Sequence, residues 1–109
     1  MDIFFKEERI RRLCETEKCA KRELGQAGAR KLIKRLADLR AVRTVGELVA
    51  GRPHALERDR EGQFALDLDG ACRLAFEAAD APIPLNGAGR VDWARVTRVT
   101  VVFIGDYHD

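Results

Sequence analysis

Seven side chains in this sequence are suited to moving protons or to binding phosphate: His54, Arg58, Arg60, Arg73, Asp106, Tyr107 and His108. Cleavage of RNA without a metal needs a base for the 2′-hydroxyl proton, an acid for the leaving 5′-oxygen and a cation for the phosphorane. Histidine suits either proton role because its pKa lies near neutrality, and the arginine guanidinium binds two phosphate oxygens at once. A sheet that brought the chain's two histidines close to an arginine would therefore hold all three groups.

The sequence ends on Asp106-Tyr107-His108-Asp109, directly after the apolar run 99–104. That run predicts a buried strand, and a strand that stops here would deliver three proton-carrying groups to the rim of a sheet. The alternative is a frayed and solvated terminus.

The other candidates also have structural explanations. Arg73 could simply pair with Asp67 across a hairpin, and His54 could be an ordinary turn residue. Tyr107 could be a half-buried aromatic with its hydroxyl in water. We expect Trp93 to cover the core rather than to stack on bases, because a single aromatic residue without aromatic neighbours is a weak RNA signal.

The first half of the chain has helical spacing. Residues 9–14 suggest a short helix, and one or two further helices are predicted over 16–42, with a break near Gly25 to Gly28. Their apolar stripe consists of Ala20, Leu24, Ala27, Gly28, Leu32, Leu36 and Leu39. Residues 3–5 are short and apolar, which favours an edge or terminal strand.

The second half alternates with the period of a sheet, and Asp69-Gly70 marks a hairpin turn. A two-residue loop would turn Arg73 onto the apolar face. A three-residue loop pairs Leu68 with Cys72, Leu66 with Leu74 and Phe64 with Phe76, and it sets Arg73 opposite Asp67, so we prefer it. Residues 78–92 are rich in Pro and Gly and predict a long loop, and 96–104 predict a central strand.

These patterns predict one α+β domain over residues 1–109. Helices of residues 7–42 should pack on one face of a small sheet that includes 62–69, 72–78 and 96–105. The length suits a single core.

Composition limits the classes of function. Residues 1–52 carry 14 Lys and Arg against 8 Asp and Glu, a net charge of +6, and residues 53–109 carry 6 against 10, a net charge of −4. A basic helical half can attract phosphate backbones, or it can be a solvated helix face. No signal peptide or membrane-spanning stretch is apparent, so we expect a cytoplasmic protein. The three cysteines lack zinc-ligand spacing and are expected to be small buried residues; we expect neither a metal site nor a disulfide.

The ordered motifs HALERDREGQF (54–64), LDLDG (66–70), RLAFE (73–77) and DYH (106–108) resemble the HigB branch of the RelE/ParE toxin superfamily, the plasmid maintenance killer proteins. This resemblance covers essentially the whole chain. It implies N-terminal helices packed on a twisted, mostly antiparallel sheet. It also implies cofactor-free cleavage of mRNA in the ribosomal A site, and a helix-turn-helix, HigA-like antitoxin that forms a hetero-oligomer with the toxin.

Carried over residue by residue, the resemblance assigns the active-site histidine to His54 and the phosphate-binding strand arginine to Arg73. The family's C-terminal Asp-Tyr-His matches Asp106, Tyr107 and His108. Where related toxins usually have a lysine credited with a phosphate contact, this chain has Glu57, and the nearby Arg58 or Arg60 would have to substitute for that lysine.

Two other functions stay open. The chain could be a non-catalytic protein of the same fold, either a gyrase-type poison or a degenerate toxin that only binds its antitoxin. It could also be a small nucleic-acid-binding domain without toxicity. Both histidines favour the enzyme, and Glu57 favours the binding protein.

Overall fold

The computed structural model describes residues 1–106, so the predictions for Tyr107 and His108 lie outside the described residues. The helices are α1 (Glu8–Glu15) and α2 (Glu17–Ala41), and the strands are β1 (Asp2–Phe5), β2 (His54–Ala55), β3 (Gln63–Asp67), β4 (Arg73–Ala78) and β5 (Arg98–Gly105). Three short 3₁₀ turns lie at Val45–Glu47, Arg58–Arg60 and Trp93–Arg95.

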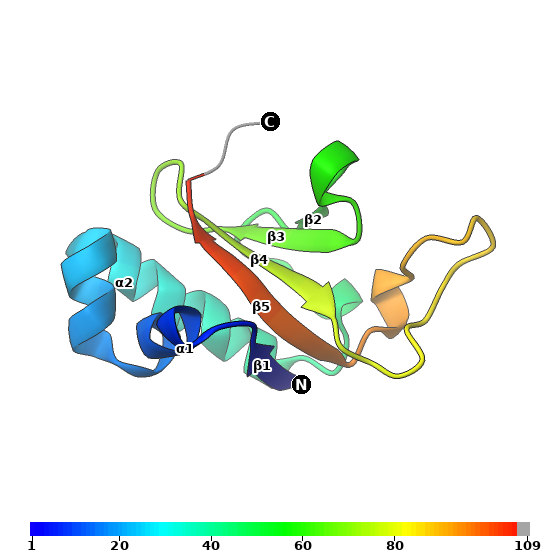
Figure 1. Cartoon of the computed structure of the whole chain (residues 1–109), viewed down its shortest axis with the longest axis horizontal. Helices are drawn as coiled ribbons and strands as arrows, with labels where there is room; N and C mark the ends of the chain where they lie inside the picture. Colours follow the sequence, from blue (N-terminus) through cyan, green and yellow to red (C-terminus); the bar gives the residue numbers. More distant parts are fainter. Residues whose placement is uncertain (107–109) are drawn as a thin grey trace.

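The strands form one sheet in the order β1-β5-β4-β3-β2. Only the β1–β5 pair is parallel, and the other neighbours are antiparallel. Both helices lie on one side of this sheet (Figure 1). The α+β prediction is therefore confirmed, with residues 2–5 at one edge and β5 inside the sheet.

The register of the β3–β4 hairpin is the one that the alternation predicted. Phe64 pairs with Phe76, Leu66 with Leu74, and Asp67 with Arg73. The Leu68 amide donates to the Cys72 carbonyl, 2.9 Å away, which closes the three-residue loop. The apolar side chains therefore share one face, and Arg73 points to the other face.

The helices cover the apolar face. α1 buries Ile10 and Leu13. The buried positions of α2 are Ala20, Gly28, Ala29, Leu32, Leu36 and Leu39. The predicted break falls at Gly25, whose φ of 77° lies in the left-handed region that glycine tolerates, and α2 bends there (Figure 1). Each half of α2 can therefore follow the surface beneath it.

The opposite face of the sheet carries a second, smaller apolar cluster. Ala65 and Ala75 are fully buried there beside Leu56, with Phe103 packed against them. None of these residues belongs to a helix, so this face is the open side of the molecule. We call it the open face.

The segment between β4 and β5 is a long loop, as predicted, and its ends are tied down. The Asp80 carboxylate accepts hydrogen bonds from the Thr97 hydroxyl at 2.6 Å and from the Thr97 and Arg98 amides at 3.0 and 3.1 Å. Trp93 lies 4.9 Å from Phe64 and 6.0 Å from Phe76, ring centre to ring centre, which confirms that it covers the core.

The cysteines depart from the expectation of full burial, because all three are half-buried. Cys14 and Cys72 pack against the edge of the main core. Burial raises the pKa of the Cys14 thiol to about 12, so this thiol is inert at neutral pH. Over residues 1–106, neither helix combines the length and apolar character needed to span a membrane.

Candidate functional site

A carboxylate between two arginines forms the centre of the candidate site on the open face. Arg73 Nε lies 2.9 Å from Asp67 Oδ1, and Arg52 Nε lies 2.9 Å from Asp67 Oδ2. Arg73 Nη1 also donates to the carbonyls of Gly70 and Cys72, each at 3.2 Å. Arg73 therefore does pair with Asp67, and these contacts fix the plane of its guanidinium group.

His54 belongs to the same face. It pairs with Ala65 on β3, two residues from Asp67, and alternation along a strand puts the side chains of such positions on one side. His54 Nδ1 lies 2.7 Å from the Arg52 carbonyl oxygen. Because a carbonyl only accepts, Nδ1 is the donor in this contact, and in the neutral form of the ring Nε2 is the basic nitrogen.

The pKa of Asp67 reflects this cationic surrounding. Burial by itself raises the pKa of the carboxyl group, but the hydrogen bond from Arg52 and the charges of Arg73, Arg52 and His54 outweigh it. The net effect lowers the pKa below its ordinary value, so Asp67 is ionised at neutral pH. The carboxylate cancels one of the two arginine charges and leaves the cluster cationic.

The strand β5 brings Asp106 to the same end of the sheet. Gly105 pairs with Arg73, and Asp106 follows it directly. Burial raises the pKa of the Cys72 thiol, and the charge of Asp106 raises it further, which places Asp106 near the start of β4. The described end of β5 lies beside the β3–β4 turn (Figure 1). Asp106 thus lies at the same end of the sheet as Arg73.

The two arginines expected to replace the missing lysine are placed differently. Arg58 is exposed and, with His54 and Glu57, lines a cavity of about 290 Å³ along the edge strand β2. Arg60 lies over the Phe103 ring at 4.6 Å and donates to Gln63 Oε1 at 3.0 Å. Arg58 is therefore the one placed beside His54.

Sequence reasoning missed Arg52, which lies directly before Pro53 in a Gly/Pro segment typical of a turn. Its position depends on Asp67, fifteen residues away, so no local pattern could have found it. Among residues 1–106, no group of three or more His, Cys, Asp or Glu side chains is arranged to hold a metal ion.

No protein-family model matches the sequence, and no curated protein matches it. The structure, however, is similar to a solved YoeB/ParE toxin from Agrobacterium tumefaciens, with a TM-score of 0.59 and 12% identity. The match covers 99% of this chain and 100% of that one. The chain therefore shares the fold of that toxin, as the resemblance implied.

Proposed function

We propose that this protein is the toxin of a type II toxin–antitoxin system, and that it is a HigB-like endoribonuclease acting on mRNA at the ribosome. The observation that supports this most is the placement of His54 and Arg73 beside the Asp67 carboxylate on the open face of a toxin-like fold. Such a surface can offer a base and a fixed cation to the same phosphodiester.

In the proposed reaction, His54 and His108 share the two proton-transfer roles. His54 Nε2 suits removal of the 2′-hydroxyl proton, because Nδ1 already donates to the Arg52 carbonyl. Arg73 stabilises the negative charge of the phosphorane, with Arg52 beside it. Asp106 and Tyr107 orient the histidine or the RNA. No metal or cofactor is required for these steps.

The proposed partners are mRNA, the ribosome and a helix-turn-helix, HigA-like antitoxin that forms a hetero-oligomer with this chain. The net charge of +6 on residues 1–52 favours association with ribosomal RNA.

A second function, a non-catalytic binding protein of the same fold, is favoured by two observations. Asp67 and two carbonyls already occupy Nε and Nη1 of Arg73, which reduces its capacity for phosphate. Glu57 adds negative charge beside His54, where it repels phosphate.

The two functions differ in what happens to messages in cells that express the chain without an antitoxin. The endoribonuclease arrests growth and leaves cut messages, which primer extension detects. Arg73→Ala should lower cleavage roughly a hundred-fold or more, and His108→Ala by about 10²–10⁴-fold.

The matched control is Arg98→Ala, an exposed arginine at the far end of β5, which should keep full activity. All three variants should still fold and bind the antitoxin. Growth arrest with intact messages would show that the chain acts as a binding poison and not as an endoribonuclease. A chain that neither arrests growth nor cuts messages would be a degenerate toxin.

A further inference from the structure

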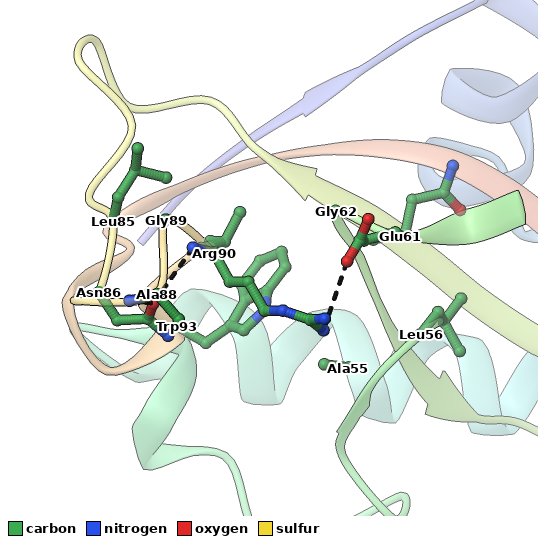
Figure 2. A pocket seen from close by; sticks show the side chains of 12 residues that line it. Ala55, Leu56, Glu61, Gly62, Leu85, Asn86, Ala88, Gly89, Arg90 and Trp93 are labelled. Atoms are coloured by element: carbon green, nitrogen blue, oxygen red, sulfur yellow. Dashed lines mark hydrogen bonds and ion pairs between the residues drawn. The ribbon is translucent and has the colours of Figure 1, made fainter. Parts of the chain in front are cut away.

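A groove of about 590 Å³ lies between the 55–63 segment and the 85–93 loop, next to the cavity that contains His54 (Figure 2). Its lining consists of Ala55, Leu56, Glu61, Gly62, Gln63, Leu85, Asn86, Ala88, Gly89, Arg90, Val91 and Trp93. This volume admits one planar group of the size of a nucleobase.

The groove has an aromatic wall that is held in place from behind. Trp93 packs against Phe64 and Phe76 in the core, while its remaining surface lines the groove. A wall that is already immobile loses no side-chain entropy when a flat ligand stacks on it. Leu56, Leu85 and Val91 add apolar surface around it.

The rim of the groove is electrically balanced. Arg90 reaches across the opening to Glu61, with 3.3 Å between Nη1 and Oε1 (Figure 2). An entering phosphate would meet the Glu61 carboxylate, whereas an uncharged planar group meets no opposing charge. The charges of the rim therefore favour a nucleobase over a phosphate.

The ion pair over the opening can break without disturbing the loop backbone. Both side chains of the Arg90–Glu61 pair are more than half exposed, and exposed ion pairs of this kind contribute little stability. The loop backbone is held separately, because Asn86 Oδ1 accepts hydrogen bonds from the amides of Ala88 and Arg90 at 2.9 and 3.1 Å.

The groove adjoins the cavity beside His54. Ala55 and Leu56 line both this groove and the smaller cavity that contains His54 and Glu57. An RNA strand whose phosphate lies near His54 can therefore direct a neighbouring base into the groove.

We propose that this groove binds one unstacked nucleobase of the RNA beside the phosphodiester at the His54–Arg73 site. The base stacks on Trp93, and the Arg90 side chain moves aside to admit it. This inference rests on the proposed RNA-directed function. It adds a position at which the protein binds the RNA through a base and not through a phosphate.

Trp93 is the only tryptophan of the chain, so its fluorescence reports on the groove directly. Arg73→Ala protein, in which cleavage should be slowed roughly a hundred-fold or more, is titrated with hexaadenylate and with the same ribose-phosphate chain lacking all bases. Hexaadenylate should quench the fluorescence and bind about ten-fold or more tighter, as stacking on an aromatic side chain predicts. The base-free chain should bind weakly and leave the fluorescence unchanged.

A second variant tests the groove without altering the core. Ala88→Phe, on the exposed rim, should fill the groove and abolish the base-dependent gain in affinity. The matched control Ile83→Phe, an exposed position of the same loop that does not line the groove, should bind like the parent.

Equal affinity for the two chains, or no quenching by hexaadenylate, overturns the inference. It is also overturned if only an antitoxin peptide quenches Trp93. Base-dependent quenching in a protein that never cuts messages would support base binding in the groove and refute the proposed endoribonuclease activity. Cleavage of messages without base-dependent quenching would refute base binding in the groove and leave the proposed enzyme standing.

Discussion

Asp67 is the residue on which the arrangement of the proposed site depends most. It accepts from Arg52 and Arg73, and these arginines come from segments on either side of β3. A carboxylate in this position costs some attraction for phosphate, but it fixes both guanidinium groups in space. Orientation of a charged group before the substrate arrives is a large part of catalysis.

Asp67→Asn should therefore separate binding from chemistry. RNA should bind more tightly, because the Arg52, Asp67 and Arg73 group gains one unit of positive charge, and cleavage at saturating RNA should fall about ten-fold as Arg73 loses its fixed orientation. Fluorescence anisotropy measures the binding, and a single-turnover assay on ribosomes measures the cleavage. Asp67→Glu should restore part of the rate.

The control for this pair of measurements is Asp69→Asn, an exposed carboxylate of the same hairpin, which should change neither quantity. A parallel loss of binding and cleavage in Asp67→Asn would instead indicate a simple loss of structure.

Glu57 is the residue that departs from the related toxins. Its substitution, unlike that of Asp67, is not expected to lower the rate of mRNA cleavage. Glu57→Lys should leave mRNA cleavage unchanged or raise it, because it replaces a charge that repels phosphate with one that attracts it beside His54. Primer extension at matched expression levels provides the measurement. A clear fall in cleavage would mean that Glu57 has a positive role.

At the level of elements, the Asp80 carboxylate is one anchor of the loop between β4 and β5. Burial raises the pKa of Asp80, but hydrogen bonds from the Thr97 hydroxyl and amide and from the Arg98 amide outweigh burial. The net effect lowers the pKa below the ordinary 3.8, so the ionised form supports the folded state at neutral pH.

Asp80→Ala should lower the free energy of unfolding by about 1–2 kcal/mol at pH 7, since hydrogen bonds to a charged acceptor are lost. A group with a lowered folded pKa stabilises above its unfolded pKa, and this contribution disappears as the pH falls through the folded value. The gap between wild type and variant should thus be full at about pH 6 and shrink below about pH 4.

Urea unfolding at several pH values tests this, with the exposed Asp59→Ala as a control that should show no gap. A gap that persists unchanged to pH 2 would rule out the ionised carboxylate as the anchor.

At the level of the whole molecule, the two faces of the sheet have different tasks. α1 and α2 cover one face and complete the core, so the other face is left open for Asp67, Arg73 and His54. This division makes stability depend on α2 and activity on the open face.

Leu36 and Ile33 of α2 test that division, because they lie three residues apart and differ in burial. Leu36 is 1% exposed and Ile33 is 49% exposed. Leu36→Ala should lower the free energy of unfolding by about 2–5 kcal/mol, because it leaves a cavity in the core. Ile33→Ala should change it by under about 1 kcal/mol, since alanine has the better helix propensity. Similar losses in the two variants would contradict this orientation of the helix.

The sequence alone determined the main helices and strands, though not the short strand β2, and it determined the hairpin register. Alternation with a period of two leaves one register that keeps Phe64, Leu66 and Leu68 on the apolar face. The position of Arg73 opposite Asp67 follows from that register. The same reasoning identified β5 and named His54, Arg73 and Asp106 as candidates. The assignments of Tyr107 and His108 stay predictions, since both lie outside the described residues.

Only the tertiary structure decided which of these groups meet. Arg52 joins Asp67 across fifteen residues, and the groove forms where the 85–93 loop folds against the 55–63 segment. Local patterns specify the type of an element and the face on which each side chain lies. Contacts between distant segments depend instead on how the sheet is ordered and how its loops close, which is settled only when the whole core packs.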